Sequence, residues 1–228
     1  MGDTAPRRKV GFLHTTPATI GQVSDALKLH LPCVDPVHVY DGNVKIDNFH
    51  SPAGVTPKSN LLRWAVFADQ LERAGCELIV SCCSLMPRAT AFAKQVVSIP
   101  FIQLDAVILD HAVERFSRIG VLTTTEYTVP YVKEGLEERA ARVGKKLELV
   151  FGGDPTALTL FNAGEFEKHD QMVLGNISEL EARGVECVLM GQIPFALMGG
   201  AIGRRDWKVP VLYAGADAWA RVGELLES

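Results

Sequence analysis

An internal repeat restricts what this 228-residue chain can fold into more than any other feature of its sequence. The segment RIGVLTTT (Arg118–Thr125) resembles KVGFLHTT (Lys9–Thr16), with glycine, leucine and paired threonines matched at an offset of 109 residues. Two further pairs of segments match in the same order, Leu180–Pro194 with Leu71–Leu85 at the same offset, and Val209–Ala216 with Ile99–Ala106 at an offset of 110. Three blocks that recur in one order at nearly one offset are hard to obtain by chance. The chain is therefore expected to contain two copies of one structural unit.

Each copy is expected to be a small α/β unit, with a parallel sheet and helices on both faces. In both copies a short apolar run, typical of a buried strand, leads into hydroxyl residues and then into a helical pattern. The first half is predicted to comprise residues 1–116 and 210–228, and the second half residues 117–209, with the C-terminal helix crossing back to the first half. The strand ends of two such pseudo-symmetric halves are expected to face one cleft, and we predict that the active site lies there.

Two stretches of the first half are less regular. Residues 41–57 are rich in glycine, asparagine and proline and are expected to form a loop, and loops of that length are often functional lids. Residues 97–103 are expected to form a strand that Pro100 interrupts.

Composition excludes several classes of protein. Hydrophobic content of 47% with 22% charged residues is ordinary for a soluble globular protein, and the net charge of −4 argues against nucleic acid or an anionic membrane as a partner. No apolar run approaches the roughly 18 residues of a membrane span. Five cysteines without a C-x-x-C spacing predict reduced thiols, a cytoplasmic location and no metal site. No Gly-rich phosphate loop is present, and we expect no cofactor.

Two adjacent thiols, Cys82 and Cys83, stand where an apolar run ends and a helical pattern begins, in ELIVSCCSLMP (Glu77–Pro87). Ligands of open parallel sheets bind beyond the carboxyl ends of the strands, so a reactive group is well placed at such a junction. Neighbouring side chains of a strand point to opposite faces, so only one of the two thiols can readily enter the cleft. The repeat matches Cys83 with Gln192 and Cys82 with Gly191. We interpret Cys83 as the active-site thiol and Cys82 as part of the strand.

The sequence resembles the aspartate/glutamate racemase superfamily, which includes glutamate, aspartate and hydantoin racemases, maleate isomerase and arylmalonate decarboxylase. In that superfamily a strand leads into a catalytic cysteine followed by small polar residues, and SCCSL (Ser81–Leu85) is similar. A second motif, usually Leu-Gly-Cys, appears here as LMGQIP (Leu189–Pro194), in which Gln192 replaces the cysteine. The resemblance covers essentially the whole chain and implies two α/β halves with one active-site position at a strand end in each.

The replacement of the second thiol bears on the reaction. A cofactor-independent racemase removes an α-proton from one face of its substrate and returns a proton to the other, so it needs an acid/base group on each side. Thiols suit this task because their pKa, near 8.5, can be tuned towards neutrality, whereas glutamine does not titrate. A two-thiol mechanism therefore cannot be transferred to this chain.

Three interpretations remain open. The resemblance favours a racemase or isomerase acting at the α-carbon of a small carboxylic acid, with Cys83 as acid/base and Gln192 as a hydrogen-bond donor to the substrate or a developing enolate. His14, at the end of the first strand, would then replace the missing thiol or, more simply, deprotonate Cys83. The single thiol favours instead a decarboxylase or lyase of the arylmalonate type. The third interpretation is a small-carboxylate binding protein without turnover.

Recognition of the substrate carboxylate is expected from hydroxyl groups and backbone amides where strands run into helices, because helix N-termini bind anions. The resemblance implies this role for the segment Gly120–Val129 in particular. The predicted substrate-binding residues are Thr15, Thr16, Cys82, Ser84, Thr124, Thr125 and Tyr127. The expected partner is a small carboxylate, and a homodimer or higher homo-oligomer is compatible with the resemblance.

Overall fold

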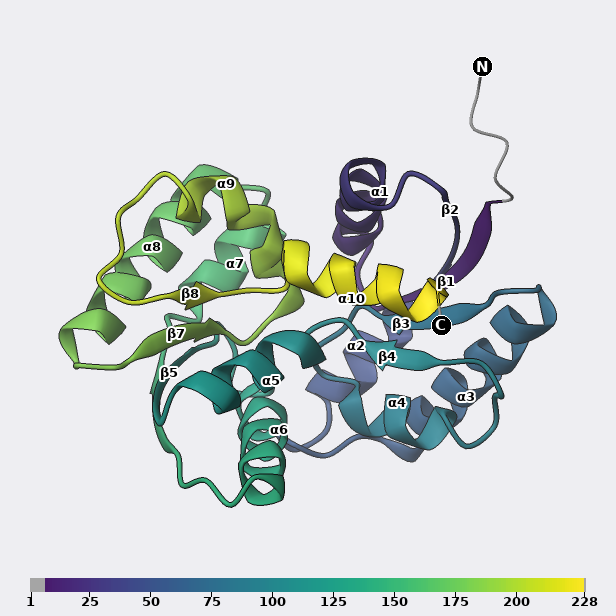
Figure 1. Ribbon diagram of the computed structural model, residues 1–228, viewed down its shortest axis with the longest axis horizontal. Coiled ribbons are helices and arrows are strands. Elements are labelled where there is room, and N and C mark those ends of the chain that lie inside the picture. Colours follow the sequence, from purple (N-terminus) through teal and green to yellow (C-terminus); the bar gives the residue numbers. More distant parts are fainter. Residues whose placement is uncertain (1–6, 228) are drawn as a thin grey trace. The chain divides into compact units, whose positions relative to one another are not determined.

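A computed structural model describes residues 7–227 and divides the chain into two compact units (Figure 1). The first unit contains the described residues up to Leu104 together with those from Ala216 onward, and the second unit is Asp105–Gly215. The chain therefore leaves the first unit once and returns to it with its last helix.

The first unit is a four-stranded parallel sheet in the order β2-β1-β3-β4. The register aligns Gly11 of the central strand β1 with Val37 on one side and Ile79 on the other. The elements of this unit are β1 Arg8–His14, α1 Ala18–His30, β2 Val34–Tyr40, α2 Gly42–Phe49, α3 Lys58–Arg73, β3 Leu78–Ser81, α4 Pro87–Ala93, β4 Phe101–Gln103 and α10 Ala216–Glu227.

The second unit repeats this arrangement, with a parallel sheet in the order β6-β5-β7-β8. Its elements are α5 Ala106–Arg115, β5 Arg118–Leu122, α6 Val129–Arg142, β6 Glu148–Gly152, α7 Thr156–Asn162, α8 Phe166–Ala182, β7 Cys187–Met190, η1 Ile193–Met198, α9 Gly199–Ile202 and β8 Val211–Leu212. The same strand order in both units confirms the predicted fold class of two similar α/β halves.

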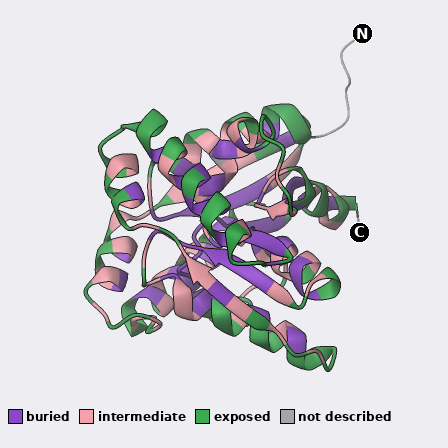
Figure 2. Ribbon diagram, turned by 90° about the vertical axis from the view of Figure 1, so that its left-hand side faces the viewer, coloured by how far each residue is buried: buried purple, intermediate pink, exposed green. Residues whose placement is uncertain are grey.

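Helices cover both faces of the first sheet. Successive residues of β1 point to opposite faces, so its apolar side chains contact helices on both sides. On one face the ring of Phe12 lies 6.4 Å from that of Trp219 in α10. On the other face a Cβ at Gly11 would lie 2.6 Å from Leu71 Cδ1, so glycine lets α3 approach the sheet closely. Figure 2 shows the result, with buried strands flanked by helices whose outer sides are exposed.

The second sheet is buried in the same way. Val188 and Met190 of β7 belong to an apolar cluster with Ile177 of α8. Cys187 and Leu189, which alternate with them, belong to a second cluster with helices α5 and α6. Burial on both faces explains why these strands read as continuous apolar runs in the sequence.

Two local predictions were wrong. About half of residues 41–57 is not a loop, because Gly42–Phe49 forms α2. The Asp41 side chain accepts a hydrogen bond from Asn43 N at 2.8 Å and so caps the helix, and Val44 and Asn48 are buried one turn apart. The strand expected over residues 97–103 is shorter, because β4 begins only after Pro100, at Phe101.

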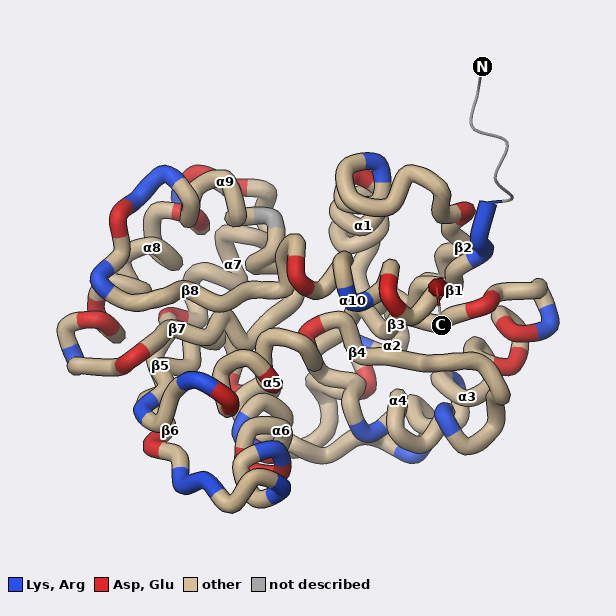
Figure 3. The backbone as a smooth tube through the Cα atoms, viewed as in Figure 1, with Lys and Arg blue, Asp and Glu red and all other residues tan. Residues whose placement is uncertain are grey.

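Charged residues stand mainly in the helices and connecting segments of both units, and the strands contain few of them (Figure 3). Across the described part of the chain, no helix has both the length and the apolar character that spanning a bilayer requires.

Candidate active site

Cys83 lies two residues beyond the end of β3 and is 8% exposed. Its sulfur accepts a hydrogen bond from the Thr15 hydroxyl, with Oγ1 and Sγ 2.9 Å apart. Thr15 directly follows β1, the neighbour of β3 in the sheet, so parallel pairing of these strands brings the two side chains together. A donor aimed at sulfur stabilises the thiolate relative to the neutral thiol.

The backbone of Cys83 is held as well as its side chain. Its carbonyl oxygen accepts hydrogen bonds from Met86 N at 3.1 Å and from Gln103 Nε2 at 2.5 Å. Ser84, the next residue, is also buried.

The neighbouring thiol is in a different environment. Cys82 is 1% exposed, its Sγ lies 3.9 Å from Val80 O, and its backbone N–H extends the sheet by donating to Leu13 O. Cys82 and Cys83 are both free thiols, so no vicinal disulfide joins them.

His14, the last residue of β1, is fully buried and forms a pair with His38 of β2. Its Nε2 lies 2.9 Å from His38 Nδ1, and its Nδ1 lies 2.8 Å from Thr19 Oγ1. Burial, reinforced by repulsion from His38, lowers the pKa of His14 to about 3, and burial also lowers the pKa of His38. Both rings are therefore neutral near pH 7.

The hydrogen-bond directions in this pair follow from Thr19. Its hydroxyl donates to Thr16 O at 2.9 Å, so it accepts from His14 Nδ1–H. His14 Nε2 then carries no proton and accepts from His38 Nδ1–H. Both nitrogens of His14 are engaged, and deprotonation of Cys83 by His14 would require one of these bonds to break.

The Thr15–Thr16 turn also borders a cavity of ≈440 Å³ in the first unit. The cavity is lined by this turn, the end of β2 and helix α2, and Lys45 contributes a cation to its wall. The Lys45 ammonium lies 5.9 Å from the centre of the Phe49 ring. Thr15 thus both lines the cavity and donates to the Cys83 sulfur.

In the second unit Gln192 lies two residues beyond the end of β7 and directly before η1. Its Oε1 accepts from Thr124 N at 2.7 Å and from Thr124 Oγ1 at 2.9 Å. Because a backbone N–H can only donate, the atom facing it is the amide oxygen, and Nε2 is the donor end of the side chain. Gln192 is therefore an anchored donor, and not an acid or base.

The other predicted binding residues of this unit lie in the turn between β5 and α6. Tyr127 N lies 3.4 Å from Thr125 Oγ1, and Thr128 N donates to Thr125 O at 3.3 Å. The structure thus places Cys83 with Thr15 in the first unit, and Gln192 with Thr124 in the second.

A family model described as Asp/Glu/Hydantoin racemase matches residues 53–222. The chain belongs to this family of enzymes. A comparison with curated protein sequences gives no match.

Solved structures with the same fold include several racemases. Glutamate racemase RacE1 from Bacillus anthracis is 17% identical with a TM-score of 0.69, covering 98% of this chain and 83% of that protein. Glutamate racemase from Francisella tularensis, solved with D-glutamate, is 14% identical with a TM-score of 0.70 and coverages of 98% and 82%. Aspartate racemase from Picrophilus torridus is 16% identical with a TM-score of 0.67 and coverages of 96% and 93%.

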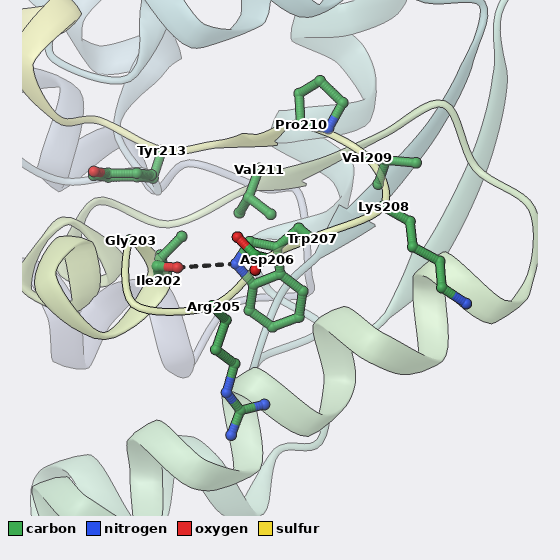
Figure 4. Close-up of a pocket in the computed structure, with 10 residues that line it drawn as sticks. All are labelled: Ile202, Gly203, Arg205, Asp206, Trp207, Lys208, Val209, Pro210, Val211 and Tyr213. Atoms are coloured by element: carbon green, nitrogen blue, oxygen red, sulfur yellow. Dashed lines mark hydrogen bonds between the residues drawn. The ribbon is translucent and has the colours of Figure 1, made fainter.

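A second cavity of this Asp/Glu/Hydantoin racemase family member, ≈500 Å³ in volume, lies in the second unit between α9 and β8 (Figure 4). Trp207 Nε1 donates to Ile202 O at 3.0 Å, and the Arg205 guanidinium lies 5.8 Å from the Trp207 ring. Arg205 and Lys208 point away from one another, so their charges do not converge on one ligand. None of the predicted site residues lines this cavity.

Sequence reasoning missed three residues of the first unit that contact the site, namely Thr19, His38 and Gln103. His38 had a signal, because it is a polar residue inside the apolar run of β2. Gln103 had one as well, since it ends β4 as Ser81 ends β3, and the two residues are in register. Within residues 7–227, no three His, Cys, Asp or Glu side chains gather as metal ligands.

Proposed function

We propose that the protein is a cofactor-independent isomerase that acts at the α-carbon of a small carboxylic acid, with Cys83 as its acid/base group. The observation that carries this proposal is the 2.9 Å hydrogen bond from the Thr15 hydroxyl to the Cys83 sulfur, at the carboxyl end of a central strand. Structural cysteines do not need a donor aimed at sulfur, whereas a thiol that must form a thiolate benefits from one.

The thiolate of Cys83 removes the α-proton from one face of the substrate, and inversion then requires a proton from solvent at the opposite face, because the Gln192 amide cannot supply one. Thr15 stabilises the thiolate before the reaction. Negative charge develops on the substrate carboxylate as the proton leaves, and the Nε2 amide hydrogens of Gln192 are suited to stabilise it, since this donor cannot lose its proton at neutral pH.

The substrate carboxylate is held by hydroxyls and backbone amides at the strand ends. Thr15 and Thr16 border the ≈440 Å³ cavity, in which Lys45 supplies a positive charge. The proposed substrate-binding residues remain Thr15, Thr16, Cys82, Ser84, Thr124, Thr125 and Tyr127.

We propose that His14 acts on Cys83 indirectly in the resting enzyme. Through Thr19 it fixes the carbonyl of Thr16, and with it the turn that aims the Thr15 hydroxyl at the thiol. A direct role as a base would require His14 to exchange a hydrogen bond to Thr19 or His38 for one to Cys83.

The second candidate is a one-thiol decarboxylase or lyase. It is favoured by the anchoring of Gln192, whose amide oxygen is held by two donors from Thr124 and whose nitrogen cannot take the place of a second thiol. A carboxylate-binding protein without turnover is the third.

The solved relatives named as glutamate and aspartate racemases guide the choice of substrates to test. We also propose a reducing, cytoplasmic setting, because the mechanism needs the Cys83 sulfur as a thiol and not as a disulfide. Assembly into a homodimer is a further proposal, and light scattering of the purified protein tests it.

Proton NMR in deuterium oxide separates the three candidates. Both enantiomers of glutamate and aspartate, a hydantoin and an arylmalonate are incubated with the wild type, with Cys83→Ala and with the matched control Cys82→Ala. Deuterium incorporation at the α-carbon with inversion supports the isomerase, and loss of carbon dioxide or exchange with retention supports the one-thiol enzyme. Binding without either change supports the third candidate.

The two cysteine variants test the site. Cys83→Ala is expected to abolish turnover, whereas Cys82→Ala, which leaves the Cys83 thiol in place, is expected to retain part of it. Full activity of Cys83→Ala would show that this thiol is not the acid/base group.

A further inference from the structure

Gln103 connects the backbone of Cys83 to a buried chain of hydrogen bonds. Its Nε2 donates to Cys83 O at 2.5 Å, and its Oε1 accepts from Thr90 Oγ1 of α4 at 3.0 Å. Thr90 Oγ1 in turn accepts from the indole Nε1 of Trp64 in α3 at 3.3 Å. Two helices and the edge strand β4 are thus joined to the thiol residue through side chains.

The direction of this chain is fixed at both ends. The Trp64 indole nitrogen can only donate, so the single proton of the Thr90 hydroxyl is left to donate to Gln103. At the other end the carbonyl of Cys83 can only accept. The Gln103 amide therefore presents oxygen to Thr90 and nitrogen to Cys83, and a flipped amide would oppose acceptor to acceptor at Cys83.

Burial makes this arrangement costly to disturb. Trp64 is 0% and Thr90 2% exposed, so water does not readily replace a lost partner at that end of the chain. Gln103 is held in one orientation against the peptide that follows the thiol.

The consequence concerns the peptide bond between Cys83 and Ser84. Its carbonyl is held by Gln103 Nε2 and Met86 N. In a planar trans peptide the N–H points opposite to the C=O, so fixing the carbonyl also fixes the direction of the Ser84 N–H. Gln103 and Met86 N together thereby fix the direction of the amide that follows the thiol residue.

The second unit lacks this chain at the equivalent positions. The repeat places Val173, Gly199 and Tyr213 where the first unit has Trp64, Thr90 and Gln103. A Cβ at Gly199 would lie 3.0 Å from the Tyr213 hydroxyl, so the residues equivalent to Thr90 and Gln103 are also close together. They cannot form the hydrogen bond that joins Thr90 to Gln103, because glycine has no hydroxyl. The side-chain support is present in the unit that carries the thiol and absent from the matched positions of the unit that carries Gln192.

We infer that Gln103 is a positioning residue for the reaction, which orients the Ser84 N–H so that a substrate carboxylate is held beside the Cys83 sulfur. This inference rests on the proposed function, since it requires Cys83 to meet a carboxylate. Gln103 acts through the peptide and not on the substrate itself.

Alkylation of the thiol by two reagents of similar size tests the inference without knowledge of the substrate. Iodoacetate carries a carboxylate and iodoacetamide does not. Their rates at Cys83 are followed by mass spectrometry of the Cys83 peptide in wild type, Gln103→Met and Gln103→Glu, with N-acetylcysteine as the reference thiol. Gln95→Met is the matched control, because Gln95 is exposed and lies outside the chain of hydrogen bonds.

Wild type is expected to prefer iodoacetate about tenfold more than N-acetylcysteine does, the scale of one hydrogen bond to a charged group. Gln103→Met is expected to lose that preference and to keep its iodoacetamide rate within about threefold, because the thiol and Thr15 are unchanged. Gln103→Glu keeps the acceptor for Thr90 but has no donor for Cys83, so it should also lose the preference even if Gln103→Met folds poorly.

Several results would overturn the inference. A preference retained in both Gln103 variants would do so and leave the proposed function intact. An equal fall in both rates would mean that Gln103 only supports the fold. No iodoacetate preference in wild type would overturn the inference together with a carboxylate site at Cys83.

Discussion

Acidification should destabilise this protein well above the pH at which carboxylates protonate, and His14 should account for much of the loss. Burial lowers the pKa of His14 to about 3, from an ordinary value of 6.5. Unfolding releases the ring to water, so below pH 6.5 the unfolded chain binds a proton that the folded chain does not. Stability therefore falls as the pH drops from about 6.5 and stops falling, for this group, near pH 3.

The two pKa values give the magnitude. Between pH 7.5 and pH 5 the free energy of unfolding is expected to decrease by about 2 kcal/mol because of His14 alone, and between pH 7.5 and pH 3 by about 4 kcal/mol. The lowered pKa of His38 adds a loss of the same sign. At pH 5 the His14 contribution depends mainly on the unfolded-state value, because the folded ring is still neutral there.

Urea unfolding at pH 7.5, 6.5, 5.8 and 5.0, followed by fluorescence of the buried tryptophans, measures this dependence. His14→Gln is the comparison variant, because an amide offers one donor and one acceptor in place of the ring nitrogens and does not titrate. Wild type should lose about 2 kcal/mol more than the variant between pH 7.5 and pH 5. Equal losses in the two proteins would refute the account of a neutral, buried His14.

Two further predictions concern the thiol and the backbone. Thr15→Val removes the donor to Cys83 and should slow iodoacetamide alkylation of this thiol at pH 7.5 by about tenfold. Thr16→Val is the control and should leave the rate nearly unchanged. Equal rates in Thr15→Val and wild type would contradict the role of the hydroxyl. Gly153→Ala should lower stability by on the order of 3–5 kcal/mol in thermal unfolding, because a Cβ there would lie 1.8 Å from Thr123 O at a φ of +126°. Gly175 lies in the interior of α8, and a Cβ built there meets no atom within 4 Å. Gly175→Ala should therefore stabilise the protein by about 0.5–1 kcal/mol. Similar effects of the two substitutions would contradict the backbone geometry described for Gly153.

The sequence predicts the fold because strand ends, glycines and threonines recur at one offset. Each of these recurring residues meets a physical requirement of the fold. Gly11, for example, is needed where α3 approaches β1. The position of Cys83 at the end of a strand was predictable for the same reason. Helix α2 was missed because its residues are poor helix formers, and a single capping aspartate with two buried side chains decides the outcome.

The polar contacts of the site were beyond reach for a different reason. Whether His14 faces Cys83 or His38 depends on which side of β1 its side chain occupies, and on a register with β2 that no short motif reports. The role of Gln103 depends on Thr90 and Trp64, which are distant in sequence and unremarkable by composition. Hydrogen-bond directions became evident only once donor-only and acceptor-only groups were known to be neighbours.

The return of α10 to the first unit makes residues 105–215 an insertion in the sense of domain architecture. A stop codon placed before Ala216 would remove Trp219, whose ring covers Phe12 of β1, two residues before His14. A truncation before Ala216 should therefore destabilise the first unit, which carries Cys83. The second unit, Asp105–Gly215, would still be present in full. Helix α10, Ala216–Glu227, thus completes the core around strand β1, Arg8–His14, from the other end of the described chain.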